Sequence, residues 1–304
     1  MHHDLGGRPD ADVQIDEQLV RNLLAQQHPE LAELPLSWVE AGWDNAVFRL
    51  GGSLAVRLPR RQSAHALLLN EVRWLPFLAP RLPVAVPGAL YRGKPGLGYP
   101  YHWAVVPWFS GHSAAHLLVE ERDQLALQLA GFFRALHVPA PADAPKNPVR
   151  GVPLIARDSA VRQRLEHYVG EGIDELNRLW EQATETNQYR GPRLWLHGDP
   201  HPHNVIVSSE NREYQHKLAA VIDFGDLTAG DAASDLGVAW LFFSAHGLEA
   251  FRGLAGKHAL YDADIWARAR GWALNYASLM IGLAQDDPLY EVGIHGIEML
   301  LSEV

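Results

Sequence analysis

The order of strand-like and helical segments constrains the fold of this 304-residue chain more than any other feature. Short apolar runs of the kind that form strands occupy residues 36–40, 46–50, 54–58, 89–91 and 103–106. Gly51-Gly52 separates two of these runs and predicts the turn of a hairpin. Apolar residues at helical spacing predict helices over residues 15–27 and 63–78. This part of the chain therefore predicts a small antiparallel sheet, with the second helix packed on it.

The rest of the chain is mainly helical in its pattern. Segments with helical periodicity cover residues 114–136, 159–182 and 262–283, and strand-like residues occur only near 193–196, 205–207 and 218–222. A proline-rich connector over residues 139–153 separates the first two segments. We therefore expect an α+β fold of two lobes, residues 1–107 and residues 108–304. Clefts between such lobes are favoured ligand sites.

The composition excludes several classes of protein. With 47% hydrophobic and 20% charged residues, the chain is typical of a globular protein. It contains no cysteine, which excludes disulfides, thiolate metal sites and a cysteine nucleophile. The longest apolar run, residues 236–243, is too short to span a bilayer, and residues 1–6 lack the features of a signal peptide. We expect a cytoplasmic protein with no membrane partner.

The distribution of charge indicates the kind of partner. A net charge of −10 argues against a nucleic-acid partner, which would require a basic surface. Residues 1–107 carry 10 Lys and Arg against 10 Asp and Glu, whereas residues 108–304 carry 16 against 26. The whole net charge therefore lies in the second lobe. An acidic lobe can attract a cationic ligand, although acidic surface also serves solubility alone.

The segment from His197 to Asn204, followed by Val221-Ile222-Asp223-Phe224-Gly225-Asp226, carries the most chemical information. It contains an Asp at 199, an Asn five positions later and a second Asp that ends an apolar run. Phosphoryl transfer needs this set, because one carboxylate must orient the attacking hydroxyl while an amide oxygen and a second carboxylate hold Mg²⁺ on the phosphates. The spacing matches the H-x-D-x-x-x-x-N loop and the Asp-Phe-Gly metal ligand of kinases.

His-Gly-Asp at 197–199, together with Gly230-Asp231-Ala232-Ala233-Ser234-Asp235-Leu236, resembles the aminoglycoside phosphotransferase family, whose relatives include macrolide and choline kinases. The resemblance covers nearly the whole chain and implies a protein-kinase-like bilobal fold. It implies Asp199 as the catalytic base and Asn204 and Asp223 as Mg²⁺ ligands. His197 and Asp235 would hold the catalytic loop.

The residues expected to bind the nucleotide depart from the kinase pattern. Arg57 occupies the strand position where Lys normally contacts phosphates, with Glu71 on the following helix as its candidate partner. No G-x-G-x-x-G loop is present, so residues 42–45 would have to cover the phosphates with their backbone and Asn45. Val106 and Trp108 flank Pro107 at the expected hinge and could grip a purine with backbone groups. We expect ATP or GTP as the phosphate donor.

The resemblance implies a small hydroxylated acceptor, aminoglycoside-type antibiotics first, and the acidic second lobe agrees with a cationic one. Asp226 and His203 are candidate acceptor contacts, and Trp240, Trp266 and Trp272 fit a core role better than a stacking platform. Three alternatives stay open. These are a metabolic kinase for an amino alcohol, sugar or macrolide, a nucleotide-binding pseudokinase, and a zinc hydrolase using the His201-Pro202-His203 segment.

Overall fold

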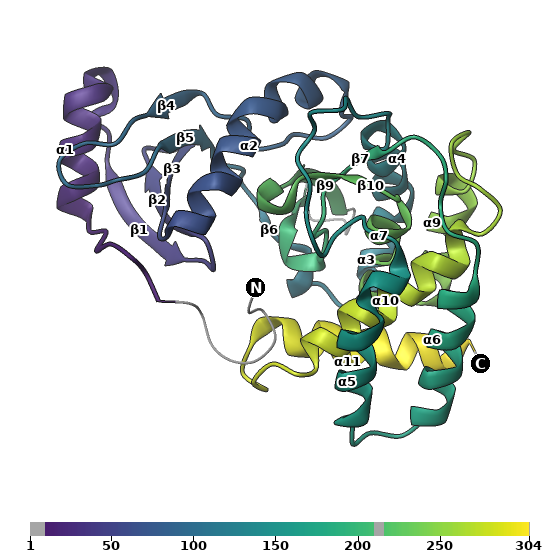
Figure 1. Cartoon of the computed structure of the whole chain (residues 1–304). Helices are drawn as coiled ribbons and strands as arrows, with labels where there is room; N and C mark the ends of the chain where they lie inside the picture. The colour runs from purple at the N-terminus through teal and green to yellow at the C-terminus, as the bar shows by residue number, and fades with distance from the viewer. Residues whose placement is uncertain (1–9, 210–215, 304) are drawn as a thin grey trace. The chain divides into compact units, whose positions relative to one another are not determined.

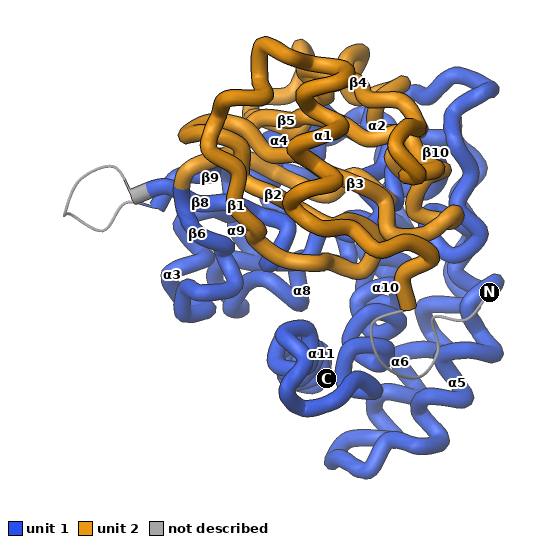
Figure 2. The backbone as a smooth tube through the Cα atoms, turned by 90° about the vertical axis from the view of Figure 1, so that its left-hand side faces the viewer, with its two compact units in different colours: residues 1–7, 111–219, 226–304 blue, residues 8–110, 220–225 orange. Residues whose placement is uncertain are grey.

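The computed structural model describes residues 10–209 and 216–303, which form two compact units (Figures 1 and 2). Among these residues, the smaller unit contains 10–110 and 220–225, and the larger contains 111–209, 216–219 and 226–303. The expected division after residue 107 thus differs in two respects: the change of unit lies at 110, and the short segment 220–225 groups with the smaller unit. The interpretation of residues 1–6 lies outside the described residues.

The smaller unit is built on a five-stranded antiparallel sheet with the order β1-β2-β3-β5-β4. Its strands are β1 (Leu36–Ala41), β2 (Asn45–Leu50), β3 (Leu54–Pro59), β4 (Tyr91–Gly93) and β5 (Trp103–Pro107). Gly51 closes the β2–β3 hairpin with a φ of 59°, a conformation that glycine adopts without steric cost. The expected strands are all present, although the fourth begins two residues later than expected.

Helices cover both faces of this sheet. Side chains of α1 (Glu17–Gln27) share a cluster with Phe48, Val56 and Val105, and Asp16 caps the helix by accepting the N–H of Leu19 at 2.8 Å. Side chains of α2 (Gln62–Leu78) pack on alternate strand residues such as Ala55 and Ala104. The two clusters follow the period of two along each strand. The sheet therefore has a second packed helix beyond the one expected.

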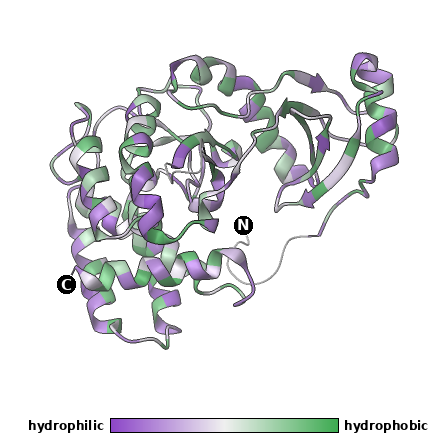
Figure 3. Ribbon diagram, turned by 180° about the vertical axis from the view of Figure 1, so that it is seen from behind, coloured by the Kyte–Doolittle hydropathy of each residue, from purple (hydrophilic) through white to green (hydrophobic). Residues whose placement is uncertain are grey.

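The larger unit is mainly helical, as the pattern predicts. Its helices are α3 (Val119–Arg122), α4 (Ala126–Leu136), α5 (Asp158–Glu166), α6 (Ile173–Glu185), α7 (Ala233–Leu236), α8 (Ala239–Phe242), α9 (Ala245–Ala255), α10 (Ile265–Met280) and α11 (Pro288–Ser302). Helix α10 is buried along most of its length and packs on α5, α6, α7, α8 and α11. Hydrophobic and hydrophilic stretches alternate along many of the helices (Figure 3), as expected where one side faces a core.

Short strands frame the polar segments of the larger unit. β7 (Leu194–Leu196) pairs with β10 (Thr228–Gly230), and a second sheet has the order β6-β8-β9. These three strands are β6 (His112–Ser113), β8 (Val205–Ser209) and β9 (His216–Val221), whose last two residues belong to the smaller unit. The segments Pro29–Leu31, Ala79–Arg81, Ala114–His116, Asp123–Leu125, Leu154–Arg157, Pro202–Asn204 and Phe224–Asp226 are 3₁₀ turns.

Two expected helices are interrupted in the structure. The segment 114–136 is divided into short turns before α4, and the segment 159–182 is divided into α5 and α6. Gly172, with a φ of 78°, precedes α6 and accounts for the second break. The apolar run 236–243 lies in the core and contains the last residue of α7 and the whole of α8. None of the helices within residues 10–209 and 216–303 has the length and apolar character needed to cross a bilayer.

Candidate active site

The loop that follows β7 is held by a buried aspartate. The backbone N–H groups of His197 and Gly198 donate to the carboxylate of Asp235, at 2.7 and 2.9 Å. Asp235 is fully buried and also lies 3.1 Å from Nε2 of His137. Hydrogen bonds to a charged group contribute about 1.5–3 kcal/mol each, so this carboxylate fixes the loop firmly. His197 is itself buried, and its Nδ1 accepts the N–H of Asp199 at 3.2 Å.

Gly198 allows the sharp turn before Asp199. Its φ is 91°, in the region that side-chain-bearing residues rarely adopt. A Cβ at this position would collide with the carbonyl oxygen of Asp226. Glycine is thus required at position 198 by the close approach of two backbone segments, and the turn leaves the Asp199 side chain 30% exposed.

Asp199 is flanked by two basic groups. Nη2 of Arg150 donates to its Oδ1 at 3.2 Å, and Nε2 of His201 lies 3.4 Å from its Oδ2. Burial acts to raise the pKa of Asp199, but His201 and Arg150 outweigh burial and hold this pKa well below its ordinary value. The carboxylate is therefore ionised at neutral pH and able to accept a hydrogen bond from a hydroxyl group.

Asn204 is buried beside Asp199 and is oriented by it. Its Nδ2 donates to the backbone carbonyl of Asp199 at 2.9 Å. This bond leaves Oδ1 as the atom that could meet a cation, since no hydrogen bond to Oδ1 occurs among the described residues. His203 lies next in the chain, but its Nε2 is 3.1 Å from the carbonyl oxygen of Pro288 at the start of α11. Burial, followed by the proximity of His201, lowers the pKa of His203.

Asp226, a candidate acceptor contact, already has partners in the larger unit. It accepts a hydrogen bond from Nδ2 of Asn147 at 2.7 Å, and Nε of Arg150 lies 4.0 Å from its other oxygen. Sequence reasoning missed both Asn147 and Arg150. They lie in the proline-rich connector and contact residues 79 and 49 positions away, and their polar character does not distinguish them there, because Asp143 and Lys146 of the same connector are polar too.

In the smaller unit, the expected pairing of Arg57 with Glu71 is present. The buried positions of α2 are 64, 68, 71, 75 and 78, a spacing that places Glu71 in the middle of the stripe facing the sheet. Arg57 on β3 meets it with two hydrogen bonds of 2.6 and 3.1 Å, and both side chains are buried. Burial acts to lower the pKa of Arg57, but Glu71 and then Asp223 reverse this and raise it. Arg57 therefore remains a cation.

Asp223 lies in the same unit and close to this pair. Its Oδ1 is 3.6 Å from Nη2 of Arg57, and its side chain is 54% exposed. Its φ of 61° is unusual for a residue with a side chain, and such conformations cost about 1–3 kcal/mol and cluster at functional sites. The segment is attached to the smaller unit by the N–H of Val221, which donates to the carbonyl of Ala85 at 3.0 Å.

The turn between β1 and β2 is held by two arginines. Nη1 of Arg60 donates to the carbonyl of Gly42 at 3.0 Å, and Nη2 of Arg61 donates to Asp44 at 2.7 Å. Asn45 ends the turn, and its Oδ1 is buried without a hydrogen-bond partner in the described part of the chain. An unpaired buried amide oxygen normally costs about 1–3 kcal/mol, so it is a candidate contact for a bound ligand.

At the expected hinge, the backbone groups of Val106 and Trp108 already have partners within the smaller unit. The N–H of Trp108 donates to the carbonyl of Ser53 at 2.8 Å, and Val106 is paired with Ala55 in the sheet. The indole ring of Trp108 is covered by the guanidinium of Arg49 at 4.9 Å. A purine could use the Trp108 N–H only if the bond to Ser53 opened.

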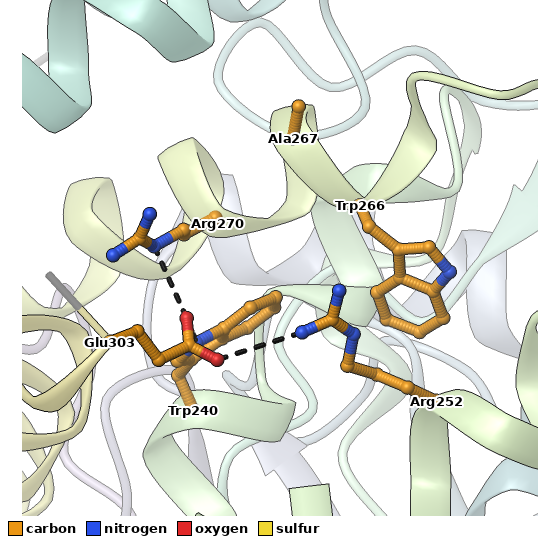
Figure 4. Close-up of a pocket in the computed structure, with 6 residues that line it drawn as sticks. All are labelled: Trp240, Arg252, Trp266, Ala267, Arg270 and Glu303. Carbon is orange, nitrogen blue, oxygen red and sulfur yellow. Dashed lines mark hydrogen bonds and ion pairs between the residues drawn. The ribbon is translucent and has the colours of Figure 1, made fainter. Parts of the chain in front are cut away.

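Trp240 and Trp266, two of the three tryptophans considered as a stacking platform, line a cavity of about 480 Å³ (Figure 4). Arg252 lies over the rings of Trp240 and Trp266, at 5.7 and 5.3 Å. Glu303 pairs with Arg252 and accepts the indole N–H of Trp240 at 2.9 Å. Trp272 is fully buried. Because the chain's own guanidinium covers the rings, they form a structural cluster rather than an open stacking surface.

A second cavity in the larger unit, of about 630 Å³, is lined by Arg150. Its volume lies in the range of small-molecule sites. Its other basic lining residues are Lys146, Arg193 and Arg268, and Asp231 pairs with Arg268 at 2.6 Å. No group of three or more His, Asp or Glu side chains within residues 10–209 and 216–303 is arranged to hold a metal ion, so the zinc alternative has no ligand set there. Magnesium differs, because it is typically bound by one or two carboxylates together with substrate phosphates.

Comparisons with known proteins agree on one family. A family model described as the phosphotransferase enzyme family matches residues 35–272. The GDP and kanamycin complex of APH(2")-IIia is 20% identical, with a TM-score of 0.69 over 94% of this chain and 99% of that one. The apoenzyme of macrolide 2'-phosphotransferase MphH from Brachybacterium faecium is also 20% identical, with a TM-score of 0.61 over 94% of each chain. No match was found among curated proteins.

Proposed function

Because this chain belongs to the phosphotransferase enzyme family, we propose that it is a small-molecule kinase. In this proposal it transfers the γ-phosphoryl group of ATP or GTP to a hydroxyl group of a small molecule. The observation that carries the proposal is the setting of Asp199, an ionised and partly exposed carboxylate on a loop whose backbone is held by buried Asp235. A reaction that depends on positioning requires a carboxylate held in this way.

Asp199 acts on the acceptor hydroxyl in this scheme. The hydroxyl donates its proton to Asp199 while its oxygen bonds to the γ-phosphorus, and the bond from that phosphorus to the β–γ bridging oxygen breaks. The nucleoside diphosphate is then the leaving group. Phosphoryl transfer passes through a loose transition state, so orientation of the hydroxyl matters more than the basicity of the carboxylate. The lowered pKa of Asp199 is therefore compatible with this role.

The residues proposed for Mg²⁺ fit the ion by their chemistry. Asn204 has its amide nitrogen committed to Asp199, which leaves a carbonyl oxygen, and Asp223 has an exposed carboxylate. Oxygen atoms are the ligands that magnesium prefers. When bound, the ion would neutralise charge on the phosphates. Arg57, positioned by Glu71, and Asn45 are the proposed nucleotide contacts, while Val106 and Trp108 are proposed to meet the purine.

For the acceptor we propose a general class, a small hydroxylated molecule. An aminoglycoside-type antibiotic is the first specific candidate, since one similar structure is a complex with kanamycin. Macrolides, amino alcohols and sugars are the alternatives. Asp226 and His203 stay proposed acceptor contacts, each with a partner that an acceptor would have to share or replace. The cytoplasmic location also stays a prediction.

Calorimetry combined with an acceptor panel tests the proposed function. We expect Mg·ATP or Mg·GTP to bind with measurable heat, and EDTA to weaken binding. Aminoglycosides, macrolides, choline-like alcohols and neutral sugars are then scored by coupled consumption of nucleotide. Absence of binding to both nucleotides, with and without Mg²⁺, would show that the kinase proposal is wrong. Binding without any hydrolysis or transfer would instead favour the pseudokinase alternative.

A further inference from the structure

Arg150 is the charged group nearest to Asp199 that the proposed reaction does not use. Its Nη2 donates to Oδ1 of Asp199 at 3.2 Å, its Nε lies 4.0 Å from Asp226, and its side chain is only 13% exposed. Bringing a guanidinium out of water beside a proposed catalytic carboxylate is costly unless the charge is compensated. The contact is therefore a built feature of the larger unit rather than a chance surface pair.

Hydrogen bonds on both sides of Arg150 fix the backbone of the connector, residues 139–153, that carries it. Oδ1 of Asn147 accepts the N–H groups of Val149 and Arg150, at 2.9 and 3.1 Å, while its Nδ2 donates to Asp226. The N–H of Gly151 donates to Oγ of Ser234 at 3.2 Å. The chain on both sides of Arg150 is thus fixed to Asp226 and to Ser234 of α7, which belong to the same unit.

An aromatic ring supports the guanidinium from one side. The guanidinium carbon of Arg150 lies 4.9 Å from the ring centre of Tyr276 on α10. The hydroxyl of Tyr276 is 2.8 Å from that of Ser234, which also accepts the N–H of Gly151. Stacking of this kind restricts the side chain and favours the cation. Arg150 is therefore pre-organised, so little reorganisation is needed when charge develops next to it.

One nitrogen of the Arg150 guanidinium is available to a ligand. Nη2 donates to Asp199 and Nε faces Asp226, whereas Nη1 makes no hydrogen bond within the described chain. The segment 197–204, which contains the proposed base, has no Lys or Arg. An acceptor oxygen within hydrogen-bond distance of Asp199 would lie within about two hydrogen-bond lengths of this guanidinium. Charge develops on that oxygen and on the phosphoryl group in the transition state.

We propose that Arg150 is a further catalytic residue that donates hydrogen bonds to the acceptor oxygen and the phosphoryl group during transfer. This rests on the proposed kinase function. The acceptor proton passes to Asp199, the new bond joins the acceptor oxygen to phosphorus, and the bond to the diphosphate breaks, while Arg150 stays protonated throughout. Arg150 also neutralises part of the charge of Asp199 and Asp226, which reduces their repulsion of the negative charge that develops in the transition state.

Nucleotide hydrolysis tests this role without a known acceptor, because water takes the place of the hydroxyl group and the products are nucleoside diphosphate and phosphate. We expect Arg150→Ala to lower kcat for Mg·ATP or Mg·GTP hydrolysis by about 100-fold or more, with KM for the nucleotide changed less than about threefold. Guanidinium chloride at millimolar concentration should restore part of the lost rate. Lys146→Ala, which removes a positive charge from the same connector and cavity, is the matched control and should retain the rate.

Two further variants separate catalysis from folding. Arg150→Lys keeps the charge and Arg150→Gln removes it at similar size, so we expect Lys to retain at least tenfold more activity than Gln at equal melting temperature. The proposal is wrong if Gln is as active as Lys, or if Arg150→Ala hydrolyses nucleotide within threefold of the wild type. If the wild-type chain neither binds nor hydrolyses Mg·nucleotide, the proposed kinase function itself has failed. If wild-type hydrolysis is unaffected by Asp199→Asn, Asp199 is not the base and the role of Arg150 falls with it.

Discussion

Each unit of this protein places one of the proposed site aspartates near an arginine, and the two arrangements differ. In the larger unit, Asp199 sits on a loop fixed by Asp235, and Arg150 holds its side chain directly at 3.2 Å. In the smaller unit, Asp223 is 54% exposed and 3.6 Å from Arg57, whose close partner is Glu71. The first carboxylate is pre-organised, and the second is left open to a ligand. A fixed carboxylate suits orientation of a hydroxyl group, whereas an exposed one suits an ion that arrives with its substrate.

Asp199→Asn gives the largest expected effect and tests the first half of the comparison. We expect kcat for phosphoryl transfer, or for nucleotide hydrolysis, to fall about 10³-fold, because the amide cannot accept the proton. The Kd of Mg·nucleotide should change less than threefold, since Asp199 acts on the acceptor. Steady-state kinetics and calorimetry on the same preparation measure both. A variant that retains a tenth or more of the wild-type rate would show that the base has been misassigned.

The comparison also shows what a sequence can predict. The contacts of His197 and Asn204 with Asp199 could be expected from the sequence, because all three lie within a few positions on one loop that resembles the catalytic loop of kinases. Pairing of Arg57 with Glu71 was predictable as well, since a charged residue within an apolar helical stripe needs a partner on the sheet it faces. The family that these motifs resemble is confirmed by the match over residues 35–272.

Contacts made by distant loops were not predictable in the same way. Arg150 reaches Asp199 across 49 positions from a proline-rich connector that has no periodicity. Its position depends on Asn147 and on Tyr276, which lies 126 positions further along the chain than Arg150. Nor does the sequence reveal that Ser53 takes the N–H of Trp108, because that bond depends on the register of two strands. The acidic character of residues 108–304 agrees with a cationic acceptor, but composition could not show that a buried arginine lies beside Asp199 and Asp226.

Glu71→Gln tests whether the second arrangement depends on its buried ion pair. The change removes the nearer of the two carboxylates beside buried Arg57 and leaves only Asp223, at 3.6 Å, so we expect the free energy of unfolding to fall by about 3 kcal/mol. Urea denaturation followed by circular dichroism measures this change. Glu17→Gln is the matched control, because it removes an exposed pair with Arg21 at 2.7 Å and should cost about 0.3–0.5 kcal/mol. Equal losses in the two variants would mean that burial of the Arg57–Glu71 pair has no special importance.

Asp223→Asn gives the smallest expected effect and sharpens the contrast with Asp199. The side chain is exposed and contributes little packing, so the free energy of unfolding should change by less than about 0.5 kcal/mol. Loss of one ligand charge should nevertheless weaken the binding of Mg·nucleotide about tenfold or more, an effect of the size found when support of a metal site is removed. Calorimetric titration with Mg·ATP and with ATP in EDTA separates the two contributions. If the variant binds Mg·ATP as tightly as the wild type, then the open carboxylate of the smaller unit does not hold the metal, and its left-handed backbone must have another cause.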